Sequence, residues 1–251
     1  MKINVILSQT QVDELYFSGK TTVVIDILRA TSTIVEALNN GAKEVIPVSS
    51  FEFAMKASGS FFGGNIILGG ERNTKKIEGF ALGNSPLEYT QKTVQGKTII
   101  LYTTNGTKAV VKAKFSETLV LCAFTNLSAV ANFLFNSEKD VEILCAGKNG
   151  GFCIEDTICA GMLISEVLKM GKQTVLNDAA KVSVFLSKSY SDDLVKILTE
   201  CEHGKLLVEN GFEKDIDHCS KVGSIDLVPI FREGTIKVNS GVRAGDFRNK
   251  V

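Results

Sequence analysis

Short apolar runs alternate along this chain with segments whose apolar residues recur at helical spacing. Thr21–Ile27 is a continuous run rich in β-branched residues, which is typical of a strand buried on both faces. After it, Ile34, Val35 and Leu38 fall on one face of a predicted helix over about 31–39, which Gly41 ends. The same reasoning predicts strands at 3–7, 44–48, 66–68, 98–102, 119–123 and 141–145, and helices at about 51–57, 107–114, 127–135 and 155–170.

Strands that alternate with helices indicate an α/β protein. We expect a three-layer α/β/α fold with a largely parallel or mixed central sheet, in one domain over residues 1–251 that has room for two lobes. Residues 177–210 are predicted to be helical, and residues 224–238 to form short strands that close or cover an edge of the sheet. The mixed stretch 71–97 is too long for an ordinary loop and is expected to be functional.

Polar residues gather where several of these strands end. Asp26 and Arg29 follow the second strand, at the position where α/β sheets bind ligands. We expect Asp26 to be a metal ligand or a general acid or base, and Arg29 to bind an anion. The alternative is structural: Asp26 caps the next helix while Arg29 pairs with a surface acid.

The segment 103–107 (TTNGT) follows another strand and precedes a helix. Its hydroxyl and backbone N–H groups predict an anion-binding turn, in which Thr104, Asn105, Gly106 and Thr107 contact phosphate. An ordinary helix cap formed by Thr or Asn is the alternative, although this many polar residues exceed what a cap requires.

Two further clusters carry acids. Gly147 lies in a glycine-rich turn that leads to Glu155 and Asp156 at the start of a helix, where acids also satisfy the helix dipole without any further function. Glu71 and Arg72 follow a Gly-Gly pair and could equally be a solvated loop. Carboxylates together with anion donors on successive strand ends indicate a phosphorylated substrate and a divalent cation.

Composition narrows the function classes. The net charge of zero gives no basic footprint for nucleic acid, and no apolar run is long enough for a membrane span. The six cysteines form no CxxC pair and are expected to be reduced core thiols of a cytoplasmic protein, and the two histidines are expected at the surface. P-loop, dinucleotide-binding and α/β-hydrolase motifs are absent from the sequence.

Four motifs in order resemble the 2-phosphosulfolactate phosphatase family. They are DILRATSTIVEAL (26–38), GERNTKKIEGFALGNSPLE (70–88), TTNGTKA (103–109) and CAGKNGGFCIEDTICAG (145–161). The resemblance covers most of the chain. One departure is Ala81, where many relatives are expected to carry an acid, so the substrate specificity of this chain could differ.

The resemblance implies a magnesium-dependent phosphatase that converts (2R)-2-phospho-3-sulfolactate and water to (2R)-3-sulfolactate and phosphate, a step toward coenzyme M. Its Mg²⁺ is expected on Asp26, Glu71 and Asp156 or Glu155, with Asp26, Arg29, Glu71 and Asp156 catalytic. Arg72, Asn84, Ser85 and Gly147 are expected to join the 104–107 turn in binding the anionic substrate. A homodimer is expected from base rates. The alternatives are a non-catalytic binding module, an isomerase or transferase, and a phosphatase for another phosphorylated hydroxy acid.

Overall fold

The computed structural model describes residues 1–60, 65–171, 173–190 and 193–239. The strands are β1 (Lys2–Ile6), β2 (Thr21–Ile25), β3 (Glu44–Val48), β4 (Ile66–Arg72), β5 (Lys75–Lys76), β6 (Thr98–Tyr102), β7 (Thr118–Cys122), β8 (Val141–Cys145), β9 (Val175–Leu176), β10 (Pro229–Arg232) and β11 (Thr235–Val238). The helices are α1 (Ala30–Asn39), α2 (Phe51–Ser60), α3 (Gln91–Val94), α4 (Gly106–Lys112), α5 (Leu127–Ser137), α6 (Ile154–Lys169), α7 (Asp178–Tyr190), α8 (Leu194–Glu200), α9 (Glu202–Glu209) and α10 (Glu213–Cys219).

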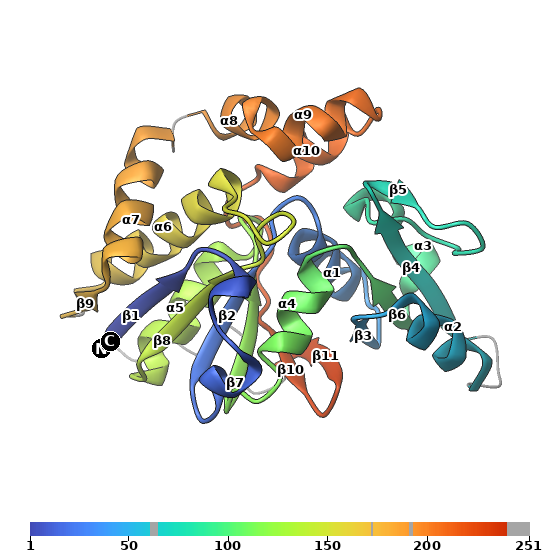
Figure 1. Ribbon diagram of the computed structural model, residues 1–251, viewed down its shortest axis with the longest axis horizontal. Coiled ribbons are helices and arrows are strands. Elements are labelled where there is room, and N and C mark those ends of the chain that lie inside the picture. The colour runs from blue at the N-terminus through green and yellow to red at the C-terminus, as the bar shows by residue number, and fades with distance from the viewer. Residues whose placement is uncertain (61–64, 172, 191–192, 240–251) are drawn as a thin grey trace.

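These strands form one mixed sheet in the order β5-β4-β6-β3-β11-β10-β7-β2-β8-β1-β9. The predicted strands and the predicted α/β class are therefore confirmed. The sheet contains two parallel blocks, one of β3, β6 and β4 and the other of β7, β2, β8, β1 and β9. Figure 1 shows the two blocks on opposite sides of the molecule, with β10 and β11 between them.

The β10–β11 hairpin lies at the centre of the sheet, so the prediction that 224–238 closes or covers an edge was wrong. β10 is antiparallel to β7, and β11 is antiparallel both to β10 and to β3. Three successive reversals make the β3 block run opposite to the β7 block. Nothing in the hairpin sequence distinguishes a central position from an edge, because its apolar residues would pack against a helix in either place.

Twist explains how the strand ends of two opposed blocks can still meet. Adjacent strands rotate by about 20–25°, so the five steps from β2 to β6 accumulate a rotation of roughly 100–125°. A rotation of that size offsets much of the reversal between the blocks. The carboxyl ends of β2, β4, β6 and β8 are consequently joined by hydrogen bonds and close contacts between their loops.

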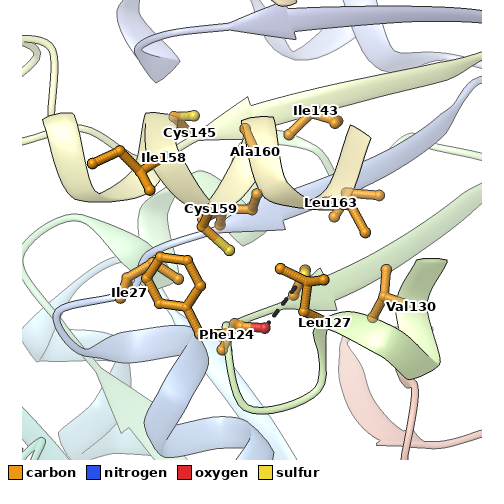
Figure 2. Packing of buried hydrophobic residues seen from close by; sticks show 14 of the residues in the cluster. Ile27, Phe124, Leu127, Val130, Ile143, Cys145, Ile158, Cys159, Ala160 and Leu163 are labelled. Carbon is orange, nitrogen blue, oxygen red and sulfur yellow. Dashed lines mark hydrogen bonds between the residues drawn. The ribbon is translucent and has the colours of Figure 1, made fainter. Parts of the chain in front are cut away.

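Each face of the sheet carries its own apolar core. Along β2, Val23 and Ile25 pack into a core with α5 and α6, whereas Val24 packs into a second core with α1 and α4. Figure 2 shows the first core, in which Cys159 and Leu163 of α6 face Leu127 of α5. This alternation in a strand buried on both faces confirms the three-layer arrangement that the continuous apolar run predicted.

Helices α8, α9 and α10 lie together at one end of the molecule (Figure 1). The predicted helical stretch 177–210 is confirmed, as the separate helices α7, α8 and α9, and α10 was not predicted. The mixed stretch 71–97 contains β5, α3 and a short 3₁₀ helix, Pro86–Glu88. All six cysteines are buried with free thiols, as expected of core residues. Within the described ranges, the structure has no helix with the length and apolarity to cross a bilayer.

The packing of α6 on α7 depends on Gly161. A Cβ atom at this position would lie 1.9 Å from the carbonyl oxygen of Ser183. Gly161→Ala should therefore lower the free energy of unfolding by about 1–3 kcal/mol, even though alanine by itself favours a helix by about 1 kcal/mol. Urea unfolding measures the change, with Lys169→Ala on the exposed face of α6 as the control. Equal stabilities of the two variants would show that the helices do not pack this closely.

Candidate active site

Asp26 lies directly after β2 and is buried. Its Oδ1 accepts a hydrogen bond from the backbone N–H of Ala30 at 3.1 Å, at the start of α1, so the predicted structural role in the helix start is confirmed. Its Oδ2 faces the turn after β6, where a Cβ atom on Gly106 would lie only 2.4 Å from that oxygen. Glycine at 106 therefore lets this turn approach the carboxylate.

Asp156 joins the ends of two neighbouring strands. This buried side chain lies in the first turn of α6, and its Oδ1 accepts the backbone N–H of Ile27 at 2.9 Å. Its Oδ2 accepts the backbone N–H of Gly147 at 3.2 Å, from the loop that follows β8. One carboxylate thus holds the β2 and β8 loops together.

Glu71 does the same in the other block of the sheet. Its Oε1 accepts the backbone N–H of Thr104 at 2.6 Å, and its Oε2 accepts that of Thr74 at 2.9 Å. Thr74 lies in the tight β4–β5 turn with a φ of +69°, a conformation that is rare for a β-branched residue. Glu71 therefore fastens this strained turn to the loop after β6.

Glu155 lies beside Asp156 in the chain and is also buried, but its surroundings differ. The thiols of Cys153 and Cys201 lie near it, but that of Cys201 donates to the carbonyl oxygen of Leu198 at 3.2 Å, and Nδ1 of His203 lies 3.8 Å from its Oε1. Thiols are weak donors. The Glu155 oxygens are thus less strongly engaged than those of Glu71 and Asp156.

The charges of these acids act on one another. Burial, together with the Glu71 and Glu155 charges, raises the pKa of Asp26 from an ordinary 3.8 to about 7, although the Ala30 N–H and the Arg29 charge oppose the change. Burial and the charge of Asp26 raise the pKa of Asp156 well above its ordinary value, and burial raises that of Glu155. Clustered carboxylates with raised pKa values are typical of functional sites.

Arg29 is buried and paired with a buried acid, so the alternative that it meets a surface acid was wrong. Its Nη1 donates to Asp215 of α10 at 2.6 Å, and its Nη2 donates to the carbonyl oxygen of Thr74 at 2.8 Å. The guanidinium lies 4.2 Å from the ring centroid of Phe212. Arg29 thus connects α1, the β4–β5 turn and α10.

The other predicted binding residues differ in how far they are buried. Arg72 is exposed, because it follows Glu71 in a strand and successive side chains point to opposite faces. Asn84 and Ser85 are buried, and Ser85 Oγ donates to Asp215 at 2.6 Å. Ala81 is exposed.

In the 103–107 turn, Thr103 and Thr107 exchange hydrogen bonds. The backbone N–H of each donates to the hydroxyl of the other, both at 3.0 Å. These two hydroxyls therefore stabilise the start of α4, as the helix-cap alternative expects. Thr104 and Asn105 instead line a cavity, while Thr107 is buried.

This cavity, of about 290 Å³, lies among the loops that the acids hold together. Its lining residues are Glu71, Asn73, Thr74, Thr104, Asn105, Lys148, Asn149, His203 and Leu206. A second cavity, of about 480 Å³, has a mostly apolar lining from the β3 end, α2 and the β10–β11 hairpin, and contains none of the predicted site residues.

His203 lines the first cavity and His218 contacts Glu36 at 3.1 Å, and their side chains are only 19% and 16% exposed, so the prediction that both histidines are surface residues was wrong. Burial and the charges of Lys148 and Arg29 lower the pKa of His203 to about 4, so the imidazole is neutral at pH 7. His203 lies far in the sequence from the acidic clusters, so no local pattern indicates that it lines this cavity. The sequence pattern marks the glycine-rich loop that contains Lys148 but predicts no role for that lysine.

The raised pKa of Asp26 has a consequence for stability. Between about pH 4 and pH 7 the folded state holds the Asp26 proton more tightly than the unfolded chain does, so the free energy of unfolding falls as the pH rises through this range. With EDTA present, Asp26→Asn should therefore be more stable than the wild type at pH 8, and the difference should shrink at pH 5.

Urea unfolding at the two pH values measures this difference. Asp178→Asn is the matched control, because the Asp178 side chain is almost fully exposed and pairs only with exposed Lys181. The control should show no such pH dependence. An Asp26→Asn effect of equal size at pH 5 and pH 8 would contradict the assignment of a raised pKa to Asp26.

Sequence comparisons place the chain in a family. The sequence model of 2-phosphosulpholactate phosphatase matches residues 6–234. A probable 2-phosphosulfolactate phosphatase of Clostridium perfringens (strain 13 / Type A) is 42% identical over 246 residues, covering 97% of this chain and 99% of the relative. A protein of the same description from Caldanaerobacter subterraneus subsp. tengcongensis is 46% identical over 220 residues, covering 88% and 91%. The chain therefore belongs to the 2-phosphosulfolactate phosphatase family.

Proposed function

We propose that this protein is a magnesium-dependent phosphoric monoester hydrolase that converts (2R)-2-phospho-3-sulfolactate and water to (2R)-3-sulfolactate and phosphate. The observation that carries the proposal is the grouping of four buried carboxylates, Asp26, Glu71, Glu155 and Asp156, beside a polar cavity that Glu71 lines. Backbone N–H groups compensate Glu71 and Asp156, but Asp26 and Glu155 are less fully compensated, and a cation would stabilise these two buried acids. The names of the relatives supply the substrate.

The donor set fits a hard divalent cation. In the described part of the chain, no three His, Cys, Asp or Glu side chains form a ready metal-binding group. Mg²⁺ does not require one, since proteins usually bind it through one or two carboxylates together with waters and substrate phosphate. We assign the two carboxylate ligands to Asp26 and Glu155, since both oxygens of Glu71 and of Asp156 already accept backbone N–H groups. When bound, the cation neutralises phosphoryl charge and lowers the pKa of a water.

The residues of the chain have distinct tasks in this proposal. Asp26 directs Oδ2 at the turn after β6, and through it either accepts a proton from the attacking water or itself attacks phosphorus. If water attacks, it gives its proton to Asp26, the ester P–O bond breaks, and the substrate alkoxide takes that proton. If Asp26 attacks, the ester P–O bond breaks as the aspartyl phosphate forms, the alkoxide takes a proton from solvent, and a water then hydrolyses the aspartyl phosphate. Thr104 and Asn105 line the cavity and offer hydroxyl and amide groups to phosphate oxygens. Glu71 and Asp156 position the loops.

Arg29 supports the site mainly through position and charge. Its bonds to Asp215 and Thr74 use two of the five donors of a guanidinium, and its charge lowers the pKa of Asp26. We propose that it holds the β4–β5 turn and α10 in place around the substrate. Arg72, which is exposed, is left without a role in this proposal.

The location and assembly of the protein also remain proposals. Six buried free thiols suit a reducing cytoplasm, and a homodimer is the commonest assembly of soluble proteins. The sulfolactate product would enter the route toward coenzyme M in organisms that have it. Light scattering after gel filtration measures the oligomeric state directly.

The proposal predicts that phosphate is released from 2-phospho-3-sulfolactate in the presence of Mg²⁺ and that EDTA abolishes the release. Asp26→Asn should reduce kcat by at least about a hundredfold, because the variant cannot accept a proton or attack phosphorus. Asp178→Asn, at an exposed acid of α7 that does not line the cavity, should retain normal turnover. Phosphate release that persists in EDTA would overturn the magnesium dependence, and near-normal turnover of Asp26→Asn would overturn the role of Asp26.

A further inference from the structure

The cavity contains a cation that the proposed chemistry at phosphorus does not use. Lys148 extends from the loop after β8, and its side chain is only 19% exposed. Among the described residues that line the cavity, it is the one with a permanent positive charge. Arg29 does not line the cavity, and two of its donors are already used by Asp215 and by the carbonyl oxygen of Thr74.

The partner of Lys148 is easily displaced. Its Nζ lies 2.7 Å from Oε1 of Glu202, the first residue of α9, and the Glu202 side chain is 86% exposed. Ion pairs of exposed side chains contribute little free energy, because water solvates the separated carboxylate almost as well. A ligand anion inside the cavity could therefore replace Glu202 at small cost.

A substrate of the proposed kind carries more negative charge than its phosphate. A carboxylate and a sulfonate flank the phosphorylated carbon, and neither takes part in the reaction. The carboxylate of Glu71, which lines the cavity, would repel such groups unless a cation received one of them. Lys148 meets this requirement, since an ammonium group binds oxyanions as a compact charge with three donors.

We propose that Lys148 is a specificity-determining residue that binds a non-transferred anionic group of the substrate, a carboxylate or a sulfonate, and that Glu202 holds Lys148 in the free protein and releases it when that group binds. This inference rests on the proposed phosphatase function and deepens it. It assigns selection of the substrate to the β8–α6 loop and α9, apart from the acids that act at phosphorus.

The test compares kcat/KM for 2-phospho-3-sulfolactate with kcat/KM for p-nitrophenyl phosphate, which has no second anionic group. Lys148→Met should lower the ratio of the two values at least about tenfold, the effect expected from losing one charged hydrogen bond. The loss should appear mainly in KM. Lys205→Met, at an exposed lysine of α9, the helix that carries Glu202, is the matched control and should leave the ratio unchanged.

Glu202→Gln tests the second half of the proposal with a surface substitution that should not disturb folding. It should lower KM for 2-phospho-3-sulfolactate about two- to fivefold, the range of a weak exposed ion pair. In the Lys148→Met background it should have no effect, because the two residues then share no interaction. Phosphate esters that carry only a carboxylate (2-phospholactate) or only a sulfonate (phosphorylated 2-hydroxyethanesulfonate) identify which group Lys148 binds, since only the relevant one loses affinity in Lys148→Met.

The outcomes separate the two proposals. If the wild-type protein releases phosphate from none of these esters, the proposed function fails. If it is active but Lys148→Met reduces kcat/KM equally for all of them, or for none, the phosphatase function stands and the role of Lys148 is overturned. An effect of Glu202→Gln that persists in the Lys148→Met background overturns the proposed release.

Discussion

The bonding of buried carboxylates to backbone N–H groups is the constraint on which this structure depends. Asp156 accepts the N–H groups of Ile27 and Gly147, and Glu71 accepts those of Thr74 and Thr104. Each acid thereby connects two loops that are distant in sequence. A backbone N–H directed at a carboxylate forms a strong charge-assisted bond, and the same bonds offset part of the cost of burying the charge. These two acids therefore fix the shape of the site.

The central hairpin gives these bonds their geometry. By joining the two parallel blocks in opposite directions, β10 and β11 allow the twist of a wide sheet to bring both sets of loops together. In a purely parallel sheet of the same width, the loops after β2 and β4 would lie far apart. Asp26 and Gly106 are one close meeting of the two blocks at the site, and a side chain at 106 would prevent it.

Helices α9 and α10 complete the site from outside the sheet. Arg29 reaches α10 through Asp215, and Lys148 reaches α9 through Glu202. Both side chains of the Arg29–Asp215 pair are buried, whereas in the Lys148–Glu202 pair the glutamate is exposed. A buried pair is costly to break, whereas an exposed pair is easily exchanged. The two contacts thus suit different tasks, permanent attachment in one case and exchange with a ligand in the other.

The sequence by itself determined the elements of the fold and the acids at the ends of the strands. Continuous apolar runs such as Thr21–Ile27, and the polar clusters that follow them, reflect short-range rules of burial and turn formation, which one segment can express alone. Only the tertiary structure decided which segments meet. The place of the hairpin depends on pairing across the whole sheet, and His203 and Lys148 join the cavity because α9 packs over the β8 loop. The burial of Arg29 likewise requires Asp215, 186 residues away in the chain, and no local pattern encodes a contact of that range.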